Sequence, residues 1–299
     1  MIAIVSPAKN MRTAGLKGLE LTRPALLEKT RRLLPMLRAL EPWELESRLK
    51  INPQLAMKAF SDFQEFESPG GESPALLSYH GLAYQNLEAE SLGLEDFAFA
   101  GGSLRILSAF YGVLRPGDAI KPIAWNFNAD SSLAEKAFTI LGRFYLPGAV
   151  PKWGYGDQFG VQGVFQNRFS LFKDRGSMIT CDFLTFRRGK LITLAALAKM
   201  ARGRMARFLI DNRIREPEGL REFSWEGYEF LRSTATAKIS GLFSVFKSEA
   251  AMPIPENSGI GSRRLIFQAA VYHDDPPLYF RRYFYDRTRN ESAGLYPGG

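Results

Sequence analysis

Residues 183–214 read FLTFRRGKLITLAALAKMARGRMARFLIDNRI, and both kinds of secondary structure are signalled in this one stretch. Residues 183–193 have the pattern of a strand pair that turns at Arg188-Gly189. Residues 195–214 are strongly helical in composition, with an apolar face that includes Met200, Met205 and Leu209. The stretch therefore predicts a pair of strands followed directly by a long helix.

The predicted helix over 195–214 is unusually basic. Against a single acid, Asp211, the segment 199–215 has six basic residues: Lys199, Arg202, Arg204, Arg207, Arg213 and Arg215. A basic amphipathic helix can follow a phosphate backbone, face an acidic lipid surface or simply present a solvated side. The helix alone leaves these three interpretations open.

Short strands and helices are also predicted towards the N-terminus. Residues 1–5 form an apolar run that ends at Ser6-Pro7, so we expect a buried strand there. Lys9 would be presented at the tip of this strand; the alternative is that it is an ordinary solvated loop lysine. Residues 24–41 have helical spacing with a break at Pro35. We also expect helices over 43–50 and 54–63, separated at Asn52-Pro53, and a strand over 75–79.

Residues 103–122 suggest two turns after a helical pattern at 104–110. The order of apolar residues and Gly112 loosely matches a helix-hairpin-helix, in which a glycine hairpin turns backbone amides towards a DNA phosphate. A second hairpin glycine is missing, so an ordinary helix followed by a turn is the alternative.

Composition limits the classes of function. The chain has 299 residues, 39 Lys and Arg against 31 Asp and Glu, a net charge of +8, one Cys and two His. These counts exclude an intrachain disulfide and a cysteine-rich metal site. No apolar run reaches the roughly 18 residues of a membrane span, and the N-terminus does not resemble a signal peptide. We therefore expect a cytoplasmic protein with no membrane partner, whose positive charge favours phosphate where it is clustered.

Several ordered segments together resemble the YaaA family of bacterial peroxide-stress proteins. They are residues 4–9 (IVSPAK), 79–81 (YHG) with Tyr84, 104–116 (LRILSAFYGVLRP), 201–207 (ARGRMAR) and 227–230 (GYEF). The resemblance covers roughly residues 1–122 and 181–230. One departure is Leu82, which stands where the family has an acidic residue after the glycine at Gly81, and it weakens any role for that loop.

The resemblance implies a mixed α/β domain with a basic cleft and a helix-hairpin-helix element. It also implies binding to double-stranded DNA and a role in limiting iron-driven damage during peroxide stress. By the motif match, the candidate DNA-binding residues are Lys9, Arg105, Arg115, Arg202, Arg204 and Arg207. No catalytic residue, metal site or cofactor is implied, and the oligomeric state is left open.

The family pattern is lost over residues 123–180, within a family-like domain that we assign to residues 1–230. When the codons are regrouped by one base, the junctions from Pro122 to Asn126 permit Tyr-Arg-Leu-Glu, the continuation expected for the family. We therefore predict that the reading frame slipped near codon 122 and was restored before about residue 181; a divergent insertion is the alternative. Trp125 would then be accidental and 123–180 poorly packed. Sequencing the gene tests this: codons that do not spell Tyr-Arg-Leu-Glu when shifted by one base would contradict the frame shift.

Two other hypotheses stand beside DNA binding. The chain could be an enzyme acting on a nucleobase or phosphorylated metabolite, with a desolvated Lys9 as nucleophile or base, helped by Ser6 and Tyr111. It could also be a damaged, non-functional family member. Residues 231–299 lie outside the resemblance and are treated as a tail of uncertain order, in which arginines and aromatic residues alternate over 276–290.

Overall fold

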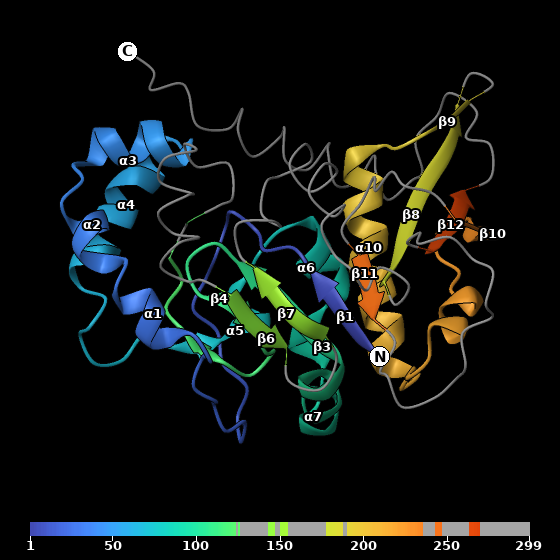
Figure 1. The fold of residues 1–299 in the computed structure, drawn as a ribbon, viewed down its shortest axis with the longest axis horizontal. Helices are drawn as coiled ribbons and strands as arrows, with labels where there is room; N and C mark the ends of the chain where they lie inside the picture. The colour runs from blue at the N-terminus through green and yellow to red at the C-terminus, as the bar shows by residue number, and fades with distance from the viewer. Residues whose placement is uncertain are drawn as a thin grey trace, which may run out of the picture.

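The computed structural model describes residues 1–123, 125, 143–146, 150–154, 178–187, 190–235, 243–246 and 263–269. Its main sheet has eight strands within this part of the chain, in the order β10-β12-β8-β11-β1-β3-β4 with β9 paired to β8 (Figure 1). The strands are β1 (Ile2–Val5), β3 (Leu104–Ser108), β4 (Gly112–Leu114), β8 (Met178–Arg187), β9 (Lys190–Ile192), β10 (Tyr228–Ala235), β11 (Phe243–Phe246) and β12 (Arg263–Ala269). Together with the helices they confirm the mixed α/β fold.

Strand β1 lies inside this sheet, and all four of its residues are buried. It pairs in parallel with β3, where Ile4 lies opposite Arg105, and antiparallel with β11. A strand that is buried on both faces reads as a continuous apolar run, which is how residues 1–5 predicted it. Two further pairs, β2 (Ser73–Pro74) with β5 (Ala119–Ile120) and β6 (Arg143–Leu146) with β7 (Val150–Gly154), form small separate sheets.

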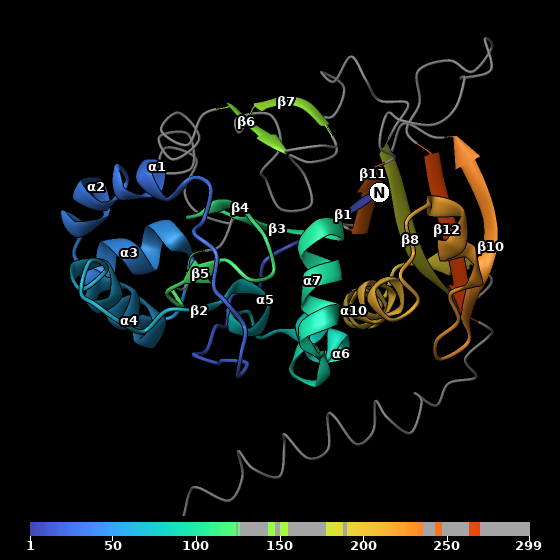
Figure 2. The ribbon, with the colours of Figure 1, turned by 90° about the horizontal axis from the view of Figure 1, so that it is seen from below.

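Four helices gather at one end of the molecule, away from β8, β10 and β12 (Figures 1 and 2). They are α1 (Leu27–Arg31), α2 (Leu34–Arg38), α3 (Pro42–Leu49) and α4 (Pro53–Gln64). The predicted break in 24–41 is confirmed, because α2 starts anew with Pro35 in its first turn, where the missing N–H costs nothing. The predicted boundary at Asn52-Pro53 is also confirmed, since the Asn52 side chain accepts a hydrogen bond from the N–H of Leu55 and caps α4.

The other helices in the described part of the chain follow α4 in sequence. They are α5 (Ala75–Ser78), α6 (Leu82–Leu87), the 3-10 helix η1 (Ala89–Ser91), α7 (Leu94–Ser103), α10 (Ala195–Asp211) and the 3-10 helix η5 (Pro217–Glu222). Helix α10 confirms the prediction over 195–214, and it lies between α6 and α7 on one side and β8 on the other (Figure 2). The predicted strand pair that precedes it is confirmed, since β8 and β9 pair antiparallel with Arg187 opposite Lys190; residues 188–189, where the turn was predicted, lie outside the described residues. In the described part of the chain, no helix is both long and apolar enough to cross a membrane.

The helical interpretation of residues 104–110 is wrong. Residues 104–108 form β3, which lies between β1 and β4, and all five are buried. A short apolar run buried on both faces has the same composition as a buried helical segment, so its periodicity does not separate the two. Residues 104–114 are therefore a strand hairpin, and the helix-hairpin-helix matched to this stretch is not formed there.

The strand predicted at 75–79 is also wrong, because residues 75–78 make the single helical turn α5. The hydroxyl of Ser78 donates to the carbonyl of Pro74, and the N–H of Leu76 donates to the carbonyl of Pro116. Five consecutive buried residues suggested a strand, but these hydrogen bonds satisfy the backbone in a turn instead.

Residues 123–180 were predicted to be poorly packed, and burial is described for two of them, Ile123 and Trp125. The prediction does not hold at these two positions. Ile123 and Trp125 are both buried, and the Trp125 ring lies 5.7 Å from Phe110 and 6.4 Å from Phe63. Residues 126–142 fall outside the described residues. In the tail, β11 and β12 take places in the main sheet, while the arginine and aromatic residues of 276–290 also fall outside them.

Candidate functional site

Three of the segments that carried the family resemblance, residues 4–9, 79–84 and 201–207, meet around helix α6. On one side, the loop after β1 runs along residues 79–84: the hydroxyl of Tyr84 donates to the carbonyl of Ser6 at 2.8 Å, and the N–H of His80 donates to the carbonyl of Asn10 at 2.8 Å. The approach is close, because a Cβ atom on Gly81 would lie 2.9 Å from the Cβ of Ala8. Lys9 is thereby placed near the N-terminus of α6, where it is exposed to solvent.

Helix α10 packs against the same short helix through Gly203. A Cβ atom on Gly203 would lie 1.9 Å from the carbonyl oxygen of Ala83, so only glycine permits this backbone contact. The contact brings the turn of α10 that contains Arg204 and Arg207 against the C-terminal end of α6, at Glu88.

Arg204 and Arg207 are both held by neighbouring groups. Arg204 forms an ion pair with the carboxylate of Glu88 at 2.8 Å. Arg207 forms an ion pair with Asp211 at 2.7 Å and also donates to the carbonyl of Glu88 and the hydroxyl of Ser91. The two side chains are 27% and 22% exposed, so both are partly accessible to solvent, although the Nε of Arg204 is buried.

Arg202 lies on α10 close to Asp182 of β8. Burial lowers the pKa of Arg202, while the negative charge of Asp182, itself a buried residue, acts in the opposite direction. Its Nε is buried and has no hydrogen-bond partner among the described residues. Arg202 is therefore part of the packing between α10 and the sheet.

Arg105 and Arg115 belong to a second group, around Asp118. Arg105 is only 5% exposed, and its Nη1 donates to the carbonyls of Gly101 and Leu104 at 2.8 and 2.6 Å. Arg115 is exposed, and its backbone N–H donates to Asp118. Burial, followed by the charge of Arg115, lowers the pKa of Arg105. Of the two candidates in this group, only Arg115 faces solvent.

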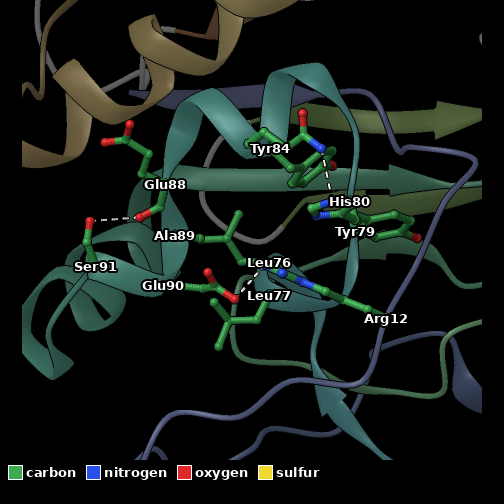
Figure 3. Close-up of a pocket in the computed structure, with 11 residues that line it drawn as sticks. Arg12, Leu76, Leu77, Tyr79, His80, Tyr84, Glu88, Ala89, Glu90 and Ser91 are labelled. Atoms are coloured by element: carbon green, nitrogen blue, oxygen red, sulfur yellow. Dashed lines mark hydrogen bonds and ion pairs between the residues drawn. The ribbon is translucent and has the colours of Figure 1, made fainter. Parts of the chain in front are cut away.

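A pocket of about 370 Å³ opens beside the same end of α6 (Figure 3). It is lined by Arg12, Leu76, Leu77, Tyr79, His80, Tyr84, Gln85, Glu88, Ala89, Glu90 and Ser91. Arg12 reaches towards Glu90 and pairs with it at 2.6 Å, and the ring Nε2 of His80 lies 2.9 Å from the side-chain amide nitrogen of Gln85. The sequence motifs did not point to Arg12 as a site residue.

Two buried tyrosines form one wall of the pocket. The rings of Tyr79 and Tyr84 lie 5.3 Å apart with 33° between their planes. Their hydroxyls are directed elsewhere, to Ser108 from Tyr79 and to the carbonyl of Ser6 from Tyr84. Burial raises the pKa of both phenols far above the ordinary value, so both stay neutral.

The geometry does not match the enzyme hypothesis built on Lys9. Lys9 is exposed and so is not desolvated, and the hydroxyl of Tyr111 accepts a hydrogen bond from the backbone N–H of Lys121. Cys181 is a fully buried free thiol. Among the described residues, no three His, Cys, Asp or Glu side chains gather closely enough to hold a metal ion.

Comparison with known proteins connects these segments. The sequence model of a family described as "Peroxide stress protein YaaA" matches residues 1–234, which include the segments around α6 and the stretch 123–180. This chain belongs to the YaaA family. One relative, a UPF0246 protein of Clostridioides difficile strain 630, is 30% identical over 235 residues, covering 77% of this chain and 94% of the relative.

Two other UPF0246 proteins are similar to this YaaA-family chain to the same degree. One from Bacteroides fragilis strain YCH46 is 33% identical over 242 residues, and one from Alteromonas mediterranea is 33% identical over 244. Each comparison covers 77% of this chain and 93% of the relative. The resemblance inferred from the sequence motifs is thus confirmed, and the YaaA match ends within β10.

Proposed function

We propose that this YaaA-family chain binds duplex DNA through the cations around α6 and thereby takes part in the response to peroxide stress, limiting iron-driven damage to DNA. The family's description supports the peroxide-stress context. The net charge of +8 supports a polyanionic partner. The basic cleft of this proposal runs along α6 and α10, and it does not use residues 104–114, which form strands.

One observation carries the proposal: cations lie at both ends of a short helix. Lys9 is near the N-terminus of α6, while Arg204 and Arg207 are at its C-terminus. Six helical residues span about 9 Å. One strand of a duplex passes a phosphate about every 3.4 Å along its axis, so this spacing suits several neighbouring phosphates. Contacts of this kind carry no base information, and we expect binding that is independent of sequence.

The existing ion pairs of Arg204 and Arg207 are compatible with phosphate binding. Partly exposed ion pairs contribute about 0 to 1 kcal/mol, so a phosphate can compete with Glu88 or Asp211. A guanidinium also has five N–H donors, and these need not all serve one partner. Arg115 is exposed and can add a contact, while buried Arg105 and half-buried Arg202, whose Nε is enclosed, hold the surrounding structure in place.

The test is binding of a labelled duplex across a salt series by the full chain and by the Arg204→Gln/Arg207→Gln variant. Each phosphate contact contributes about −0.9 to the slope of log K against log salt. Losing two contacts should therefore make the slope shallower by about 1.8 and weaken binding at every salt concentration tested. A cooperative thermal melt of the variant confirms that it is folded.

The matched control is Arg32→Gln/Lys50→Gln, which removes the same charge from two exposed positions away from α10. This control should keep the salt slope of the wild type. An equal loss in both variants would mean that only net charge matters and would contradict a site at α6. A folded wild type whose binding does not depend on salt would contradict the proposed function itself.

A further inference from the structure

The pocket beside α6 shares its rim with the arginine contacts of α10. Glu88 and Ser91 line the pocket, and the same two residues are held by Arg204 and Arg207. A nucleotide whose phosphate rests on these arginines therefore has a cavity next to it. Figure 3 shows Glu88, Ala89 and Ser91 on one side of this cavity, with His80 and Tyr84 on the other.

The lining has the chemistry that suits a flat ring with polar edges. Leu76, Leu77 and Ala89 provide apolar surface, and the neutral tyrosine rings provide an aromatic wall. His80 and Gln85 offer hydrogen-bonding groups at an edge. The volume of about 370 Å³ is at the lower end of the range for small-molecule pockets, roughly 300 to 1,000 Å³, which fits one base with its sugar.

The charges around the pocket disfavour a phosphate inside it. One cation, Arg12, faces two carboxylates, those of Glu88 and Glu90. An uncharged heterocycle meets no such repulsion.

We propose that this pocket holds a single unpaired nucleobase, while the phosphate of the same nucleotide rests on the arginines of α10. That this base belongs to DNA rests on the proposed function. A free nucleoside would present the same chemistry to the pocket. Taking a base out of the stack costs less where it is already unpaired. A duplex with one unpaired base should therefore bind more tightly than its fully paired counterpart.

The experiment uses three probes with the full chain: a paired duplex, the same duplex with one bulged adenine, and free adenosine. Each is titrated against the wild type, Ala89→Phe, which fills the pocket, and Ala98→Phe, the same change on the exposed side of α7. The wild type and Ala98→Phe should prefer the bulged duplex by about tenfold, and Ala89→Phe should lose this preference while binding the paired duplex normally.

Further readouts separate the ways in which the proposal can fail. A bulged duplex carrying a photoreactive base should cross-link to residues 76–91, and His80→Ala, whose change is confined to the pocket edge, should weaken the preference if Ala89→Phe does not fold. Adenosine binding that Ala89→Phe abolishes, without any preference for the bulge, assigns the pocket to a free nucleoside. Equal affinity for both duplexes and no adenosine binding overturns the proposal. Failure to bind any duplex refutes the proposed function, and the adenosine titration then shows by itself whether the pocket binds a nucleoside.

Discussion

Gly203 of α10 and Ala83 of α6 touch through their backbones, so closely that a Cβ atom on Gly203 would lie 1.9 Å from the carbonyl oxygen of Ala83. The next nearest atoms, the carbonyl carbon of Ala83 at 2.8 Å and the N–H nitrogen of Leu87 at 3.0 Å, also belong to the backbone of α6. No side-chain rotation can relieve such a clash. The relative position of α6 and α10, and with it that of Arg204 over Glu88, depends on this glycine.

Gly203→Ala should therefore destabilise the protein by about 3 kcal/mol, because the two helices must move apart. Chemical denaturation measures this change. The control is Gly101→Ala, in the helix α7, where an added Cβ meets nothing within 4 Å. There the better helix propensity of alanine should raise stability by about 0.5 to 1 kcal/mol. A Gly203→Ala variant as stable as the wild type would contradict the close contact.

Glu88→Gln should strengthen DNA binding, since it removes the carboxylate that holds Arg204. The expected gain is about twofold to fivefold at low salt, the value of one partly exposed ion pair, and it should shrink as salt rises. Glu95→Gln, which removes the same charge from an exposed position on α7, should have a smaller effect. Unchanged or weaker binding by Glu88→Gln would mean that Arg204 makes no phosphate contact.

Asp118 and Asp96 should make opposite contributions to the pH dependence of stability. Burial raises the pKa of Asp118 above its ordinary value of 3.8, so the folded chain holds more protons than the unfolded chain between 3.8 and the raised pKa. Stability therefore falls as pH rises through that window. A hydrogen bond from Arg213 lowers the pKa of Asp96, so its contribution is complete above 3.8 and is lost as pH falls through the lowered pKa.

Urea unfolding of the wild type, Asp118→Asn and Asp96→Asn from pH 3 to 7 checks both signs. The stability of the wild type relative to Asp118→Asn should decrease as pH rises, whereas its stability relative to Asp96→Asn should increase. Two differences that change in the same direction would show that one of the two environments is misassigned.

Trp125→Ala should cost about 3 to 5 kcal/mol, because the indole is buried against Phe63 and Phe110. Trp43 is 67% exposed on α3, and Trp43→Ala should stay within about 0.5 kcal/mol of the wild type. Thermal unfolding followed by circular dichroism compares the two. Equal small effects would indicate that Trp125 is an accidental residue, as the frame-shift hypothesis expects.

The elements that the sequence predicted correctly are those with a local signal. Pro35 and the Asn52-Pro53 pair mark helix boundaries through the missing N–H of proline and the capping oxygen of asparagine. The helix α10 is long enough for its periodicity to be clear. The predictions for residues 75–78 and 104–108 were wrong because each segment is short and entirely buried, so nothing local distinguishes a turn of helix from a strand.

The candidate site was predictable in its residue types but not in its contacts. The arginine motif of α10 pointed to Arg204 and Arg207, and the structure puts both at partly exposed positions. Their partners Glu88 and Ser91 come from a distant segment and are set by the packing of α10 on α6. Arg105 looked equivalent to the other arginines in sequence, yet its position on a central strand buries it.

Glu88 and Ser91 belong both to the arginine contacts and to the lining of the pocket. Two ligands that share such residues are thermodynamically linked: whatever factor a pocket ligand imposes on the affinity for phosphate, phosphate imposes on the affinity for that ligand. A small molecule bound in the pocket beside α6 would therefore change the affinity of Arg204 and Arg207 for DNA without touching the nucleic acid. A titration with either ligand then reports on the binding of the other.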